Sequence, residues 1–145
     1  MFLKNMSKRV LDDWGHGHYG ASRGGRPHNG QDFMCNPDVK IQTHIAGEIT
    51  KYGFCYKPEP GKTSYRYVEV TDKDGYRHRF FYCTLARSQV GQNVFVGDII
   101  GYCQDISKRY RFEADSKDNN RYMINHVHYE VKTPKGNFTN PNTFL

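Results

Sequence analysis

Short runs of alternating apolar and polar residues dominate the chain from residue 39 onward. Such alternation over residues 39–43, 48–52, 65–71 and 76–85 predicts β-strands, because successive side chains of a strand point to opposite faces. Asp74-Gly75 separates the last two segments and indicates a tight type I′ hairpin with positive φ at both central residues. Glycine-spaced apolar runs over residues 91–102, and a further segment at 125–131, predict more short strands.

Three segments depart from this pattern. Residues 5–14 place Val10, Leu11 and Trp14 on one face of a helix and predict one short helix. Residues 15–30, GHGHYGASRGGRPHNG, contain six glycines and predict an ordered loop. Residues 104–125 are polar and charged, and predict a long surface loop.

Composition agrees with a single β-rich domain. The chain has 145 residues, of which 37% are hydrophobic, with 14 glycines and 11 tyrosines. We expect an arm over residues 1–18 and one domain over residues 19–145. The net charge of +6 comes from scattered basic residues, without a nucleic-acid-binding motif, so we expect no specific nucleic-acid partner. No apolar run is long enough for a membrane span or a secretory signal.

The four cysteines are separated by 20, 28 and 20 residues and form no C-x-x-C pair, which argues against a cysteine-rich zinc site. We favour burial of Cys35, Cys55, Cys83 and Cys103 as small apolar side chains. Their pairing stays open at this point.

Two short motifs contain side chains that are common metal ligands. His126 and His128 lie in NHVHYEV, where strand alternation places both on one face. His28 and Asp32 lie in HNGQDF, directly after the glycine-rich loop. Two imidazoles and one carboxylate are the ligand number of a catalytic zinc site, which keeps a fourth position open. A solvated H-x-H strand face is the alternative, and on the residues alone the two readings are balanced.

The order of these motifs resembles the LytM/lysostaphin-type peptidoglycan metalloendopeptidases. The family's H-x-x-x-D and H-x-H-x-E-V motifs are similar to GRPHNGQDF and HVHYEV, and the segments IQTHIAGEIT, VGQNVFVGDIIGY and NPNTFL also resemble family segments. The resemblance extends from about residue 19 to residue 145. It implies a mostly β, compact antiparallel β-sheet or sandwich domain with a groove, long loops and, here, a short N-terminal helix.

The same resemblance implies roles for individual residues. His28, Asp32 and His128 would bind Zn²⁺, His126 would be a catalytic histidine, and Glu130 would orient a ligand. Family members also have a Tyr-x-His-Leu strand with a second catalytic histidine. Thr84 occupies that place in Tyr82-Cys83-Thr84-Leu85, and a hydroxyl with no pKa near neutrality cannot replace an imidazole.

Other side chains are candidates for the catalytic role of the histidine that is absent at position 84. Alternation along residues 76–85 places His78, Tyr82 and Thr84 on one face, but His78 lies about 20 Å from Thr84 along a strand. Tyr82 is closer, at about 7 Å. Tyr19, with His16 and His18, is a further candidate from the glycine-rich loop.

Two functions follow from these residues. The first is a zinc metalloendopeptidase that cleaves peptide bonds of bacterial peptidoglycan. The second is a catalytically impaired zinc module that binds the cell wall or a protein partner, because loss of that one histidine also resembles the leukocyte cell-derived chemotaxin branch. Without a secretory signal, we expect a virion-associated protein or release to the wall by a non-classical route, with phage tail or virion proteins as partners.

Overall fold

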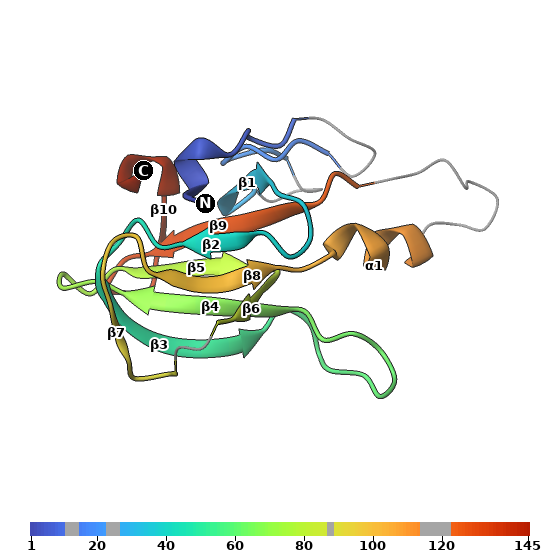
Figure 1. Ribbon diagram of the computed structural model, residues 1–145. Helices are drawn as coiled ribbons and strands as arrows, with labels where there is room; N and C mark the ends of the chain where they lie inside the picture. Colours follow the sequence, from blue (N-terminus) through green and yellow to red (C-terminus); the bar gives the residue numbers. More distant parts are fainter. Residues whose placement is uncertain (11–14, 23–26, 87–88, 114–122) are drawn as a thin grey trace.

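Two antiparallel sheets packed face to face form the molecule (Figure 1). The computed structural model describes residues 1–10, 15–22, 27–86, 89–113 and 123–145. The larger sheet has the strand order β1-β9-β5-β4-β3-β7, with β10 also paired to β9, and the smaller sheet has the order β2-β8-β6. The prediction of a mostly β, antiparallel domain is confirmed.

The strands are short. Those of the larger sheet are β1 (Gly30–Met34), β3 (Gly47–Phe54), β4 (Arg66–Thr71), β5 (Arg77–Phe81), β7 (Asn93–Val94), β9 (His126–Lys132) and β10 (Phe138–Thr139). Those of the smaller sheet are β2 (Lys40–Gln42), β6 (Cys83–Leu85) and β8 (Ile99–Cys103). The helical elements are η1 (Leu3–Asn5), α1 (Ile106–Glu113) and η2 (Pro141–Phe144). Among the described residues, no helix is long and apolar enough to span a membrane.

The core lies between the two sheets. Val127, Tyr129 and Val131 of β9 pack there with Val68 and Phe80 of the neighbouring strands. The smaller sheet contributes four further buried side chains to the same cluster: Ile41, Cys83, Ile100 and Cys103. All four cysteines are free thiols, and three of them are buried, as expected for small apolar side chains.

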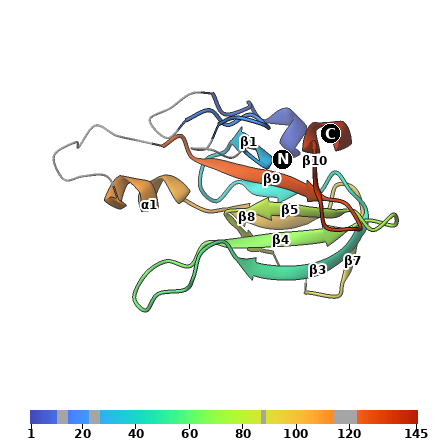
Figure 2. The same cartoon turned by 180° about the vertical axis from the view of Figure 1, so that it is seen from behind.

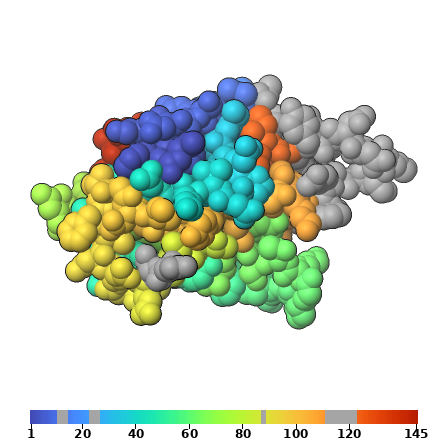
Figure 3. Space-filling view, viewed as in Figure 1, coloured from blue at the N-terminus to red at the C-terminus, as the bar shows by residue number. Residues whose placement is uncertain are grey.

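The two faces of the larger sheet therefore have different environments. Its inner face is covered by the smaller sheet, and the residues around β2, β7 and β8 form the surface of that side (Figure 3). Its outer face, formed by β9, β5, β4 and β3, is turned towards the viewer in Figure 2. The side chains of His126, His128 and Glu130 alternate with the core residues of β9 and point to this outer face.

The predictions for two segments, one helix and one loop, are wrong. Residues 5–10 form no helix: only Leu3–Asn5 make a 3-10 turn, and Lys8 is bridged to Phe33 instead. Residues 11–14 of the expected helix lie outside the described residues. Conversely, the expected loop over residues 104–125 contains α1, and residues 114–122 lie outside the described part. The Asp105 carboxylate accepts bonds from the Ser107 hydroxyl and the Lys108 N–H, which is an N-cap that the polar composition obscured.

The hairpin between β4 and β5 is present, but its turn differs from the prediction. Only Gly75 has positive φ, at 87°, and its N–H donates to the carbonyl of Asp72. The Asp72 carboxylate also accepts bonds from the N–H groups of Asp74 and Tyr76. The turn is therefore a three-residue loop with glycine in the left-handed position rather than a type I′ turn.

The predicted strand over residues 76–85 is interrupted at Tyr82, which has φ of 64°. Before this residue β5 pairs with β4 and β9, and after it β6 pairs with β8 of the other sheet. The predicted shared face of His78, Tyr82 and Thr84 is therefore wrong. His78 points into the core, whereas Tyr82 lines a pocket on the outer face.

Candidate metal centre

Three predicted ligand residues meet at one point on the outer face of the larger sheet. Among the described residues, His28, Asp32 and His128 offer ligand atoms that all lie within 4.8 Å of one another. Nε2 of His28 is 3.0 Å from Nδ1 of His128 and 3.4 Å from Oδ1 of Asp32. Nδ1 of His128 is 2.9 Å from the same carboxylate oxygen.

Strand pairing explains how residues 96 positions apart come together. Asp32 of β1 is directly opposite His128 of β9 in the antiparallel register, and Gly30 is opposite Glu130. A Cβ on Gly30 would lie 2.6 Å from Cε1 of His128 and 2.5 Å from the carbonyl oxygen of Tyr129. Glycine at this position leaves the space that the His128 ring occupies.

The glycine-rich loop fixes His28. The N–H of His28 donates to the carbonyl of Ala21, and its carbonyl accepts from the N–H of Gly20. Gly17 packs so closely that an added Cβ would lie 3.0 Å from Cβ of Asp32, and its carbonyl accepts from the Asp32 N–H. The loop is thus pressed against β1 and presents His28 beside Asp32.

In His28 and His128, the ring nitrogen that points away from the cluster is also hydrogen-bonded. Nδ1–H of His28 donates to the carbonyl of His18 at 2.9 Å, and Nε2–H of His128 donates to Oε1 of Glu130 at 3.0 Å. These bonds leave Nε2 of His28 and Nδ1 of His128 facing each other and the Asp32 carboxylate. Two nitrogen lone pairs and a carboxylate at this spacing require a positive charge between them.

The spacing fits a metal ion. Ligands of a tetrahedral zinc site, with bonds of about 2.0–2.1 Å, lie about 3.3 Å apart. The three distances within the cluster, 2.9, 3.0 and 3.4 Å, are close to this value. A proton on Nδ1 of His128 would supply the required charge, and a metal ion bound to the same nitrogen would replace it.

The electrostatics of the cluster favour an ionised Asp32. Burial alone would raise the pKa of Asp32, but the neighbouring imidazoles of His126, His128 and His28 lower it well below its usual range. Burial likewise opposes a charge on His128, whereas Asp32 and Glu130 raise its pKa to about 9. A buried carboxylate that stays ionised is available as a metal ligand at neutral pH.

His126 is close to the cluster but differs from its members. Its Nε2 is 3.6 Å from Oδ2 of Asp32, and its Nδ1–H donates to the carbonyl of Ile124 at 2.7 Å. Burial lowers the pKa of His126, despite the opposing effect of Asp32. The bond to Ile124 holds Nδ1–H, which leaves Nε2 as the ring nitrogen that faces the carboxylate.

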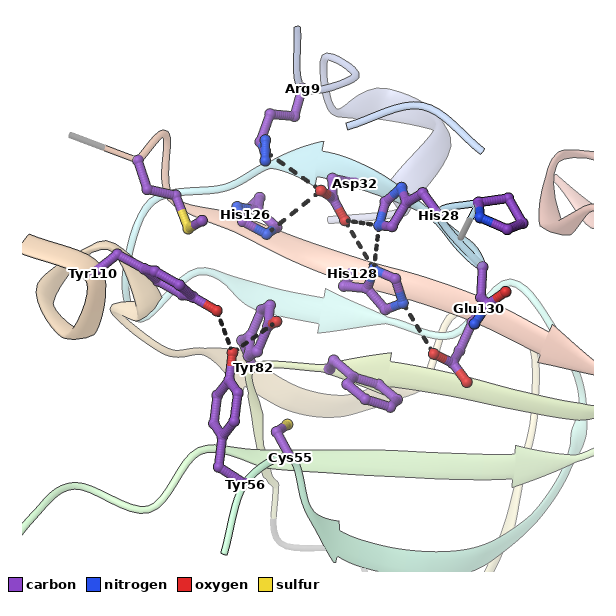
Figure 4. Close-up of a pocket in the computed structure, with 14 residues that line it drawn as sticks. Arg9, His28, Asp32, Cys55, Tyr56, Tyr82, Tyr110, His126, His128 and Glu130 are labelled. Carbon is purple, nitrogen blue, oxygen red and sulfur yellow. Dashed lines mark hydrogen bonds and ion pairs between the residues drawn. The ribbon is translucent and has the colours of Figure 1, made fainter. Parts of the chain in front are cut away.

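The cluster forms one wall of a pocket of about 510 Å³ (Figure 4). On the opposite wall the hydroxyl groups of Tyr56, Tyr82 and Tyr110 converge. The Tyr82 ring contacts His126 edge to face, with 5.4 Å between ring centroids. The pocket thus combines candidate ligands, the imidazole of His126 and three phenol hydroxyl groups.

Comparison with solved structures identifies the fold. The chain superposes on the catalytic domain of the antimicrobial peptidase lysostaphin from Staphylococcus simulans with a TM-score of 0.62 and 20% identity, over 98% of this chain and 93% of that domain. The catalytic domain of a mutant of the prophage-encoded EnpA protein from Enterococcus faecalis gives a TM-score of 0.57 and 19% identity, over 95% and 90%. The chain has the fold of the lysostaphin-type peptidases.

Sequence-based comparisons do not detect this relationship: neither a protein-family model nor a curated protein matches the chain. A second structure of lysostaphin matches with a TM-score of 0.63 and 22% identity, and the match covers 99% of this chain but 51% of that one. The chain spans about half of that protein. The motif-based resemblance is thus confirmed for the fold.

The remaining predicted residues lie outside the pocket. Thr84 is on β6, and its hydroxyl donates to the carbonyl of Tyr102 at 3.3 Å. The backbone N–H of Tyr19 donates to Oε1 of Gln31, and Tyr19 does not line the pocket. His18 contributes its carbonyl group, which orients His28, rather than its ring.

The structure adds residues that the sequence analysis missed. Arg9 is 3% exposed, and its Nε lies 3.3 Å from Oδ2 of Asp32, so its charge stabilises the ionised carboxylate. Tyr56 and Tyr110 line the pocket from the segment after β3 and from α1. The Asp105 N-cap was the available signal for α1 and hence for Tyr110. The position of Arg9 depends on the bridge between Lys8 and Phe33, which no local pattern indicates.

Proposed function

We propose that this domain is a zinc-dependent endopeptidase that cleaves peptide bonds of bacterial peptidoglycan. The observation that supports it best is the convergence of two imidazole nitrogens and an ionised carboxylate at tetrahedral spacing, on the wall of an open pocket. His28, Asp32 and His128 would hold the ion, with Arg9 and Glu130 behind them. Two nitrogens and one carboxylate oxygen suit zinc, and this ligand number is typical of catalytic rather than structural zinc.

The chain's own residues supply the proton transfers. A zinc ion in this site would polarise the scissile carbonyl and lower the pKa of a bound water molecule to about 7. Nε2 of His126 faces the same carboxylate, and because Nδ1–H is held by Ile124, Nε2 is the nitrogen that would exchange a proton. His126 would accept a proton from the attacking water and donate it to the leaving amine.

Peptidoglycan as the substrate rests on the motif resemblance and on the fold shared with the peptidase lysostaphin. A pocket of about 510 Å³ that opens on the outer face of a sheet can admit an extended peptide. The net charge of +6 favours the anionic bacterial wall. Phage-borne delivery belongs to the same proposal, and one neighbour of the same fold is prophage-encoded.

A second candidate function is a zinc-stabilised module that binds the wall or a protein partner without cleaving it. Thr84 supports it, because its hydroxyl is bonded within the smaller sheet and the residue does not line the pocket. The position therefore supplies no second catalytic side chain.

Loss of turbidity of purified cell walls tests both candidates. The native protein with one equivalent of zinc should clear the suspension, and a chelator should abolish clearing. The variant His126→Ala should keep the zinc and lose at least 10²-fold in rate, the usual contribution of acid–base catalysis. Sedimentation with walls and bound zinc, but without released peptides from any wall preparation, would instead establish the binding module.

A further inference from the structure

Tyr82 has a backbone conformation that aromatic residues rarely adopt. Its φ of 64° is one of two positive values among the non-glycine residues described. Two hydrogen bonds hold it there: its N–H donates to the carbonyl of Arg66, and its carbonyl accepts from the N–H of Gln104, both at 2.8 Å. Such outliers persist only where the surroundings enforce them, and they occur often at functional sites.

The consequence of this backbone conformation is the direction of the side chain. In a continuous strand Phe81 and Tyr82 would point to opposite faces. Here both line the pocket, and the Tyr82 ring lies against His126. The chain thus turns a phenol towards the candidate metal centre at the point where the two sheets meet (Figure 4).

The Tyr82 hydroxyl is the last member of a chain of three. The hydroxyl oxygens of Tyr110 and Tyr56 are 2.6 Å apart, and those of Tyr56 and Tyr82 are 3.3 Å apart. The guanidinium group of Arg109 lies 3.9 Å from the centre of the Tyr56 ring and makes its hydroxyl a better donor. If Tyr110 donates to Tyr56 and Tyr56 to Tyr82, the proton of Tyr82 is left to point into the pocket.

We propose that the Tyr82 hydroxyl donates a hydrogen bond to the oxyanion that forms on the scissile carbonyl, in place of the histidine absent at position 84. This inference rests on the proposed endopeptidase function. The hydroxyl keeps its proton throughout and forms no covalent bond. Burial, reinforced by Tyr56 and Tyr110, raises the pKa of Tyr82 well above 10, so the phenol remains a neutral donor.

The first test is steady-state cleavage by Tyr82→Phe, which removes only the oxygen. An oxyanion donor acts in the transition state, so kcat should fall about 10²-fold while KM and bound zinc stay unchanged. Tyr56→Phe should lower kcat by a smaller factor, about 3- to 10-fold, because it weakens only the supporting bond. Tyr76→Phe is the matched control, since Tyr76 packs on Phe144 away from the pocket, and it should behave as the native protein.

The second test does not depend on turnover. A peptide phosphinate imitates the tetrahedral intermediate, and calorimetry should show its affinity for the zinc-loaded protein falling at least tenfold in Tyr82→Phe and not in Tyr76→Phe. Values for Tyr82→Phe within threefold of native in both tests overturn the role of Tyr82 and leave the proposed function intact. A zinc-loaded native protein that neither cleaves walls nor binds the phosphinate overturns the proposed function, and this inference with it.

Discussion

The two faces of β9 each hold a histidine cluster, and the clusters differ in what their nitrogens meet. On the outer face, His128 lies between two carboxylates, and its pKa rises to about 9 although burial opposes the charge. On the inner face, His44 and His78 both contact the hydroxyl of Tyr129, the next residue of the strand. Burial, together with His78 and Lys4, lowers the pKa of His44 to about 4.

The inner cluster is a linear hydrogen-bond chain that runs from His44 to Asp72. Nε2–H of His44 donates to the Tyr129 hydroxyl, that hydroxyl donates to Nδ1 of His78, and Nε2–H of His78 donates to Asp72. Every bond in this chain has one donor and one acceptor, so no cation is required. The outer cluster has acceptors that face acceptors, and only a positive charge between them resolves the conflict. Donor and acceptor balance, more than the number of histidines, distinguishes a candidate metal site from a structural one.

Removing one histidine from each face of β9 should have opposite effects on zinc binding and on stability. His128→Ala should reduce bound zinc from about one per chain to near zero, because two ligands remain and Asp32 loses a partner. His78→Ala should keep the zinc and instead lower the free energy of unfolding. Metal analysis and chemical denaturation measure the two effects. A full zinc content in all three variants, His128→Ala, His28→Ala and Asp32→Ala, would disprove the ligand assignment.

The second prediction concerns pH and the inner face. The pKa of His44 is about 4 in the folded protein and about 6.5 when unfolded, so protonation favours the unfolded chain. The contribution is complete above pH 6.5 and is lost as the pH falls towards 4, at a cost of about 2–3 kcal/mol after allowance for partial exposure. Denaturation curves across this window should be less pH-dependent in His44→Phe. An unchanged slope in that variant would rule out His44 as the source.

The smallest expected effect comes from the second contact of His128. Glu130→Gln keeps an oxygen that can accept from Nε2–H but removes the charge, so zinc affinity should fall about 10- to 100-fold. Glu69→Gln is a matched control on the same face, because Glu69 is paired with Arg79 rather than with the cluster. Competition with a chromophoric chelator would measure both affinities. Equal zinc affinities for the two variants would mean that the charge of Glu130 does not strengthen zinc binding by His128.

The ligand set was predictable because it lies in two local motifs, and strand alternation places His126 and His128 on one face. Other parts of the site depend on contacts that no local pattern reports. Tyr82 faces the pocket only because the chain changes sheets at that residue, whereas alternation predicted one continuous strand. Arg9 reaches Asp32 through pairing between the N-terminal segment and β1. Tyr110 required a helix whose N-cap stood within a polar, charged segment.

The direct pairing of Asp32 with His128 also affects the stability of the fold. β1 lies at the edge of its sheet, paired with β9 on one side and bridged to the N-terminal segment on the other, and the cysteines form no cross-link. A metal ion shared by His28 and His128 would close a loop of about 100 residues, and in the chain-entropy model a covalent link of that length stabilises a fold by about 4–5 kcal/mol. Such an ion would link the N-terminal and C-terminal parts of the chain. Chelation should then release β1 and the glycine-rich loop before the rest of the sandwich unfolds.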